Sequence, residues 1–239
     1  MKRLYIFLIA LQLLLIPNLV KAGAQDEKRL EYTGSCVNCS LEYANFAGKD
    51  LSNKNLKGAN LSNANLKGAN LSGADLTYAI FKNANLSNAN LNNTQVRNAN
   101  FDYANLSNAS LVSADFSYIG DDNASFVGTN LSGADFRGAS LGKAMFENNE
   151  ISNANFGGAY FGGAYFWDCT FKNSNLKGVS FTKALIESTY FYNSNLDNAS
   201  FTWSKILNSS FINTSLNGTN IDQADKICNT LFPWGKIKC

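Results

Sequence analysis

Residues 59–78 read ANLSN ANLKG ANLSG ADLTY, four consecutive five-residue units with the same layout. The third residue of each unit, here called the centre, is large and apolar, as in Leu61 and Leu66. Stepping by five from Leu41 to Ile221 gives 37 centres, of which 16 are Leu, 15 are Phe, five are Val or Ile and one is Asp121. The residue two before the centre, here called the small position, is Ala in 21 of these units. The repeat therefore spans most of the 239-residue chain.

A period of five matches neither an α-helix, with its period of 3.6, nor a strand, with its period of two. Identical units that each turn a corner, and each send one large and one small side chain inward, coil around a common axis. Centres are identical in 20 of 33 pairs that are 20 residues apart, but in only 10 of 36 pairs that are five apart. We therefore expect four units per coil, with like side chains stacked one coil apart. The expected columns are Leu51, Leu71, Leu91, Leu111 and Leu131; Phe116, Phe136 and Phe156; Phe126, Phe146 and Phe166; and Phe171, Phe191 and Phe211.

Units such as Ala59-Asn60-Leu61-Ser62-Asn63 and Ala74-Asp75-Leu76-Thr77-Tyr78 resemble the A-(N/D)-L-x-x motif of the pentapeptide-repeat family. The resemblance extends over residues 39–223 and implies an all-β fold, a right-handed quadrilateral β-helix of about nine coils. Both ends of such a solenoid leave unpaired edges that must be covered. We expect residues 25–38 to form the N-terminal cap and residues 224–239 to form a disulfide-closed C-terminal cap.

Residues 1–24 have the layout of a secretory signal peptide, with Lys2 and Arg3, then an apolar run, then the small residues Ala22-Gly23-Ala24. The alternative is a retained membrane anchor, but the apolar run is shorter than the ~20 residues that a bilayer requires. Beyond this segment the sequence has no apolar stretch long enough for a transmembrane span. We expect an exported protein in the periplasm or extracellular space, or in the thylakoid lumen if the host is a cyanobacterium.

Five cysteines fit an oxidising compartment. Cys36 and Cys39 form a C-x-x-C, which is compatible with a local disulfide, a redox motif or half of a zinc site; the disulfide is favoured because zinc needs four converging ligands. A second disulfide, Cys228–Cys239, would close a short loop, and this tail resembles the C-terminal cap of secreted pentapeptide-repeat proteins. Cys169 occupies a small position, so we expect a buried free thiol.

Composition excludes several classes of function. The chain has no histidine, which removes Ser-His and Cys-His catalysis and imidazole metal ligands. Its formal net charge of +2 gives no electrostatic footprint for nucleic acid. We expect no catalytic residues, no cofactor and no bound metal.

Asp121, next to Asp122, occupies a position where the repeat has an apolar centre. A local bulge that turns Asp121 outward is favoured over a cation site, since two carboxylates are too few for calcium.

Large apolar residues at outward positions gather in the C-terminal half, and clustered outward apolar residues usually mark an interface. The alternative is that a C-terminal segment or a bulged coil covers them. The candidate interface residues are Tyr160, Tyr165, Trp167, Leu185, Tyr190, Tyr192, Trp203, Leu207 and Ile212.

Three classes of function follow from these features. The favoured one is an exported, non-catalytic scaffold or protein-interaction module of unknown partner, which could dimerise through its C-terminal half. The second is a module that binds carbohydrate or the cell envelope, with Trp and Tyr as stacking platforms for an envelope polysaccharide. Inhibition of a topoisomerase by DNA mimicry, which the resemblance to the family suggests, is disfavoured because the chain is near neutral and carries an export signal.

Overall fold

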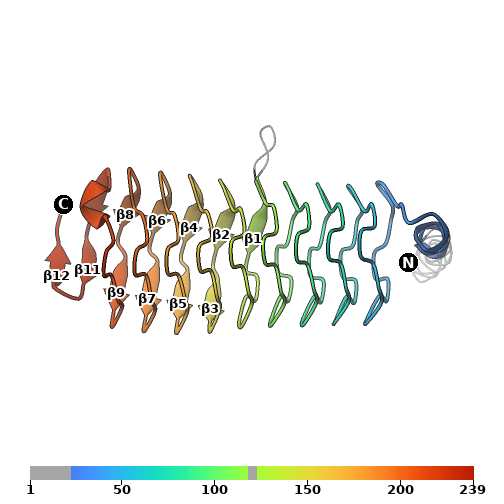
Figure 1. Ribbon diagram of the computed structural model, residues 1–239, viewed down its shortest axis with the longest axis horizontal. Helices are drawn as coiled ribbons and strands as arrows, with labels where there is room; N and C mark the ends of the chain where they lie inside the picture. Colours follow the sequence, from blue (N-terminus) through green and yellow to red (C-terminus); the bar gives the residue numbers. More distant parts are fainter. Residues whose placement is uncertain (1–22, 118–122) are drawn as a thin grey trace, which may run out of the picture.

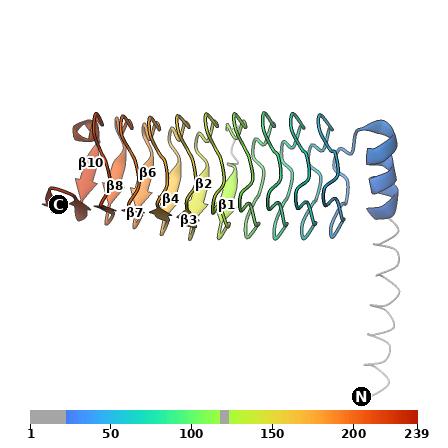
Figure 2. The same cartoon turned by 60° about the horizontal axis from the view of Figure 1, so that its bottom comes forward.

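The computed structural model describes residues 23–117 and 123–239, and they form one elongated solenoid (Figure 1). A helical segment, residues 23–33, lies at one end of the rod and the C-terminus lies at the other (Figure 2). The expected signal peptide, residues 1–24, lies mostly outside the described residues, and so do Asp121 and Asp122. Within the described part, no helix combines the length and the apolar composition that crossing a membrane would require.

Successive coils pair in parallel along the rod, and regular strands account for about five ordered turns. The first sheet has the order β1 (Ser125–Val127), β2 (Met145–Glu147), β4 (Tyr165–Trp167), β6 (Leu185–Glu187), β8 (Lys205–Leu207) and β10 (Lys226–Cys228). The second contains β3 (Glu150–Ser152), β5 (Thr170–Lys172), β7 (Tyr190–Tyr192), β9 (Ser210–Ile212), β11 (Thr230–Phe232) and β12 (Gly235–Ile237). Single bridges continue the ladder toward the N-terminus as far as Ser35 and Asn55, and they join residues 20 apart except across one longer coil. Four units per coil, as expected, set this spacing.

The core is a column of centres and small residues. The described centres from Leu41 to Phe211 are buried, and so are the alanines at the small positions from Ala44 to Ala199. Phenylalanines one coil apart stack face to face: the Phe126 and Phe146 rings are 4.6 Å apart at 2°. Burial of such side chains is worth about 1.5–3 kcal/mol each, so the repeat itself supplies most of the favourable burial in the rod.

Two of the expected columns are each wrong at one step, because one coil is longer than the others. Their other steps, from Leu51 to Leu111 and from Phe136 to Phe156, are confirmed. The bridges Asn100–Ser125 and Ser110–Asp135 join residues 25 apart, so five extra residues separate these coils. Leu111 consequently lies in the column of Phe136 and not in that of Leu131. The Phe116 and Phe136 rings are tilted by 40° at 6.1 Å and belong to neighbouring columns. The other two expected phenylalanine columns are confirmed, since they do not cross the extra residues.

Most corners are closed by a backbone hydrogen bond from the small position to the preceding centre, such as Ala64 N–H to the Leu61 carbonyl (3.1 Å). The residue before the small position is then left-handed, with φ of 59° at Asn63. Asparagine and glycine tolerate this conformation best, which explains much of the asparagine content. Other asparagines precede the centre, where Asn60 Oδ1 accepts a hydrogen bond from the Ser62 N–H (3.1 Å).

The regular strands form mainly where corners are open and lack this bond. There the small position often holds a polar residue in place of alanine, and its hydroxyl satisfies the backbone. Ser194 Oγ accepts from the Ser174 N–H (3.2 Å), and its single proton is shared between the carbonyls of Phe171 (3.3 Å) and Tyr192 (3.0 Å). Equivalent buried hydroxyls belong to Ser174, Thr189, Ser209, Thr214 and Thr230. These hydroxyls bond to the backbone at the open corners that connect the strands of the two sheets in the C-terminal half.

The ends of the rod are covered differently. At the N-terminal end the helical segment packs Leu30 into the core. At the C-terminal end the ladder continues past residue 223, through a short 3-10 helix (Ile221–Gln223), into β10 and β11, which pair in parallel with β8 and β9. Of the described strands, β12 alone pairs antiparallel, on β11. Phe232 stacks on Phe211 and Trp234 stacks on Phe232, which extends one aromatic column beyond the last coil.

Candidate interaction surface

The first sheet presents two outward columns of side chains in the C-terminal half. In one column Met145, Tyr165 and Leu185 are direct neighbours on β2, β4 and β6. Tyr165 is 48% exposed, and Leu185 is partly buried. Lys205 follows on β8. The first three residues form an apolar strip on one face, because residues paired in register on neighbouring parallel strands point to the same side of the sheet.

The other column of the same sheet mixes apolar and acidic residues. Its order is Val127, Glu147, Trp167, Glu187 and Leu207. Trp167 and Leu207 therefore share one face, two coils apart, with Glu187 between them. Trp167 is 58% exposed, and Leu207 is partly buried. The tryptophan is flanked on both sides by a glutamate.

The second sheet places three more of the candidate residues on the adjoining face. Tyr190 and Tyr192 are the outward residues of β7, and both are exposed. Ile212 on β9 is the direct neighbour of Tyr192, whereas Ser210 is the neighbour of Tyr190. Polar residues such as Thr170 interrupt the apolar contacts on this face more than on the first.

Tyr160 and Trp203 lie apart from both sheets. The Tyr160 ring runs beside Gly142 and Gly162, and an added Cβ at Gly162 would overlap the ring. Trp203 occupies a corner with a φ of 57°, and the Lys183 ammonium lies 5.3 Å from the centre of its ring. The nine candidate residues thus divide among the first sheet, the second sheet, a further face and a corner.

Several exposed aromatic and apolar residues are not among the nine candidates predicted from the sequence. Met145 precedes Tyr165 by 20 residues, so the length of one coil would have identified it. The others are Tyr32 in the helical segment, Ile80, the corner residues Tyr43, Tyr78 and Tyr103 of the N-terminal half, and Leu231, Trp234 and Ile237 at the C-terminal end. Exposed aromatic residues are therefore not confined to the C-terminal half, and what distinguishes that half is their position on paired strands.

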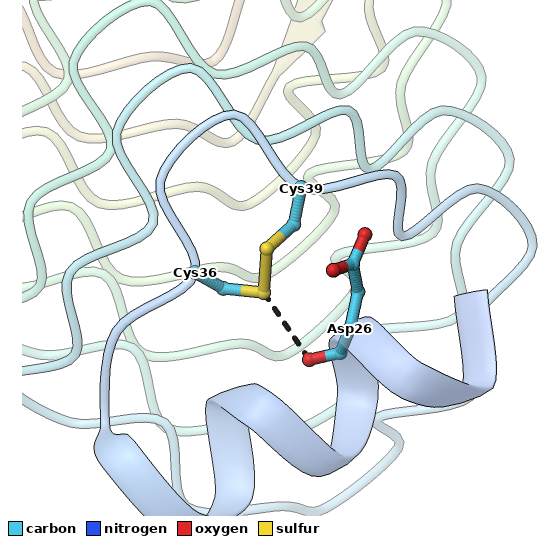
Figure 3. A group of neighbouring side chains, drawn as sticks. All are labelled: Asp26, Cys36 and Cys39. Carbon is cyan, nitrogen blue, oxygen red and sulfur yellow. Dashed lines mark hydrogen bonds between the residues drawn. A yellow bond between two sulfur atoms is a disulfide. The ribbon is translucent and has the colours of Figure 1, made fainter. Parts of the chain in front are cut away.

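Asp26, Cys36 and Cys39 form a group of potential metal ligands at the N-terminal end of the rod (Figure 3). The two cysteines are joined as a disulfide, with Cα atoms 5.3 Å apart, which is an ordinary separation. One Asp26 carboxylate oxygen accepts the Ser40 N–H at 2.9 Å. Metals bind cysteine as the thiolate, which a disulfide does not offer, so this arrangement ties the helical segment to the first coil.

The other three cysteines lie at the C-terminal end and in the core. The structure pairs Cys228 with Cys239, with Cα atoms 4.6 Å apart, and leaves Cys169 as a buried free thiol. Burial raises the pKa of Cys169 from 9.0 to about 12, outweighing hydrogen bonds that act in the opposite direction. A thiol in this state is a poor nucleophile.

A hollow of about 360 Å³ separates the helical segment from the first coils. Leu30, Phe46 and Leu51 contribute apolar lining, and Lys49 and Lys54 contribute charge. The two lysines occupy small positions of the repeat without being buried in the core, which leaves this space open. The hollow therefore lies between the helical segment and the units around Phe46 and Leu51.

Comparison with known proteins agrees with this fold. A family model for pentapeptide repeats matches in 8 copies over residues 39–77, 55–93, 79–117, 122–148, 150–187 and 189–225. No curated protein matches the sequence. One similar solved structure is that of HetL from the cyanobacterium Nostoc sp. strain PCC 7120, a pentapeptide repeat protein involved in heterocyst differentiation regulation. It is 20% identical in sequence, the match covers 85% of this chain and 91% of the HetL chain, and the TM-score is 0.58. A pentapeptide repeat protein from the Arabidopsis thaliana thylakoid lumen is 36% identical over 44% of this chain and 68% of its own, with a TM-score of 0.39.

Proposed function

Because this chain belongs to the pentapeptide-repeat family, we propose that it is a non-catalytic interaction module that binds a protein partner through the first sheet of its C-terminal half. One observation carries the proposal: Tyr165 and Trp167 both project from the short strand β4, with Met145 and Leu185 beside Tyr165 on the neighbouring strands. Tyrosine and tryptophan are among the side chains that most often anchor protein interfaces.

The packing beneath this surface favours binding. Phe166 lies between Tyr165 and Trp167 in the sequence and points inward, where it stacks on Phe146 at 4.9 Å and meets Phe161 edge-on at 5.1 Å. Strand β4 also pairs in parallel with both of its neighbours. The outward side chains are consequently held on an ordered backbone before a partner arrives, which lowers the entropic cost of association.

Export is part of the proposal and is supported by the basic, apolar and small-residue segments of residues 1–24. Cleavage after Ala24 would leave Asp26 in place to accept the Ser40 N–H. N-terminal sequencing of the protein produced from its complete reading frame should begin at Gln25, or at Gly23 if cleavage follows Ala22. A mature protein that begins at Met1 would contradict export by this route.

The interaction is tested by affinity capture from the exported fraction of the native host. The double variant Tyr165→Ser/Trp167→Ser should lose the captured protein, and sedimentation of the same variant tests whether the partner is a second copy of the chain. Tyr43→Ser/Tyr78→Ser is the matched control, since it also removes two exposed aromatic residues. Equal capture by the two double variants would refute the proposed surface.

Carbohydrate binding is the second candidate, favoured by the pair of exposed tyrosines on β7, whose neighbours on the adjoining strands are polar apart from Ile212. Such rings can stack on the faces of sugars. Co-sedimentation with peptidoglycan or cellulose, and its loss in Tyr190→Ala/Tyr192→Ala, would separate this function from the first.

A further inference from the structure

We infer that the column Glu147, Trp167 and Glu187 is a recognition site for a cationic side chain, an arginine or lysine, presented by the protein partner. The inference rests on the proposed function and specifies the chemistry of the partner. It follows from the register of three neighbouring strands, the exposure of the ring and the charges around it.

The register places each glutamate one strand from the indole. Glu147 on β2 is opposite Trp167 on β4, and Trp167 is opposite Glu187 on β6. Neighbouring strands are about 4.8 Å apart, so a cation resting on the ring would lie within reach of carboxylates on both sides. Cations bind favourably within about 6 Å of the centre of an aromatic ring, and tryptophan is the strongest partner.

The same chain already shows this kind of contact at one of its corners. Lys183 precedes Trp203 by one coil, and its ammonium lies 5.3 Å from the centre of the Trp203 ring. A spacing of one coil therefore suffices to bring a charged group to an indole. At Trp167 the residues one coil before and one coil after are both glutamates. Trp203 is supplied with a cation by its own chain, whereas Trp167 is supplied with two carboxylates that would hold an external one.

The two glutamates take part in none of the ion pairs in the described part of the chain. Those pairs join Arg97 to Asp115, Arg137 to Asp135 and Lys205 to Asp225. Glu147 Oε1 accepts a hydrogen bond at 3.3 Å from the side chain of its neighbour Asn148, a neutral donor. Both glutamates are partly exposed, so they carry their charge without the desolvation cost of full burial.

The neighbouring column defines the rest of the ligand. Met145, Tyr165 and Leu185 run alongside the acidic column and offer apolar contact. Val127 and Leu207 extend the acidic column at its two ends, where they can contact the methylene stem of a long basic side chain. The occupant that fits is a protein segment with a basic residue beside an apolar one.

The test is titration of the mature protein with a short synthetic peptide of alternating leucine and arginine, followed by fluorescence anisotropy. A second peptide with citrulline in place of arginine keeps the shape and removes the charge. Trp167→Ala should weaken binding of the arginine peptide about tenfold. Glu147→Gln/Glu187→Gln should weaken it several-fold and flatten its salt dependence.

Two matched controls should leave the affinity within about twofold of wild type, the size of effect expected for surface changes remote from the contact. Trp203→Ala removes a similarly exposed indole that Lys183 already contacts. Glu31→Gln/Glu150→Gln removes the same two charges from exposed positions elsewhere.

Three results would overturn the inference. They are an equal loss of affinity in the two charge variants, equal binding of the citrulline peptide, and a neutral cello-oligosaccharide whose binding requires Trp167 but neither glutamate. If Tyr165→Ser/Trp167→Ser releases the native partner while Glu147→Gln/Glu187→Gln does not, the proposed function stands and the cation site alone is refuted.

Discussion

Replacing Ser194 by alanine should destabilise the protein, although alanine is the commonest residue at this position of the repeat. The side chain is 3% exposed, and its hydroxyl lies among three backbone groups. Its single proton is shared between the carbonyls of Tyr192 and Phe171, and its oxygen accepts from the N–H of Ser174. A substitution toward the repeat consensus would therefore remove an acceptor on which the open corner depends.

The magnitude follows from what is left unpaired. The substitution removes one oxygen, so it creates almost no cavity, but the buried N–H of Ser174 loses its acceptor. Leaving a buried donor unsatisfied costs about 1–3 kcal/mol. For a chain of this length, each kcal/mol lowers the melting temperature by about 2–4 °C.

Ser204→Ala is the matched control, because Ser204 is also buried but lies at a closed corner. Its N–H donates to the Phe201 carbonyl at 3.0 Å, and its hydroxyl donates to the same oxygen at 2.8 Å. Removing this hydroxyl leaves both backbone groups paired, so we expect a cost of about 0.5 kcal/mol.

Urea unfolding followed by circular dichroism compares the two variants, with equal m-values required for a two-state comparison. The reasoning is refuted if Ser194→Ala is as stable as wild type, or if it loses no more stability than Ser204→Ala. Either result would mean that the open corner closes on its own when the hydroxyl is removed.

Four further outcomes are expected. Ala104→Leu should lower stability by about 1–3 kcal/mol or more by overpacking the core, and unchanged thermal unfolding would contradict the inward position of Ala104. Cys169 should resist thiol reagents until the protein unfolds. Its pKa is about 12 in the folded protein and 9.0 in the unfolded chain, so its contribution to stability should be complete below pH 9.0 and should decline as the pH rises from 9.0 toward 12. Partial burial alone would raise the pKa of Asp115, but hydrogen bonds from Ser117 and Arg97 hold it below its ordinary value of 3.8. The contribution of this carboxylate to stability, at most about 1 kcal/mol, should therefore be present above pH 3.8 and lost as the pH falls through the lowered pKa. NMR titration of Arg97→Gln should find a higher pKa for Asp115. Non-reducing mass spectrometry should find the four cap cysteines in two bridges, and a peptide linking the two ends of the rod would contradict the pairing.

The candidate surface was predicted only in part. Placing Tyr165 beside Leu185, and Tyr192 beside Ile212, requires only the coil length of 20 residues, which the matching centres already indicated. The position of Trp203 could not be predicted in the same way, because its contact with Lys183 depends on side-chain conformation at a corner.

Open and closed corners could not be predicted from the residue type either. Ser194 and Ser204 occupy equivalent small positions, yet the first bridges two coils at an open corner and the second lies at a closed one. A hydroxyl can satisfy either arrangement. Which one forms depends on whether the neighbouring coil supplies a partner for it.

The amino-acid pattern was enough to establish the solenoid, its inward residues and the number of units in a coil, because a large side chain at every fifth residue can be buried only inside such a turn. The folded structure was needed to show which side chains meet across coils. The five extra residues before Ser125 equal one repeat in length, so the period of five continues unbroken along the sequence. In the folded rod, however, every later unit lies one face further round than a constant coil of 20 residues would place it. Contacts between coils depend on that shift, and a pattern that is periodic in five does not record it.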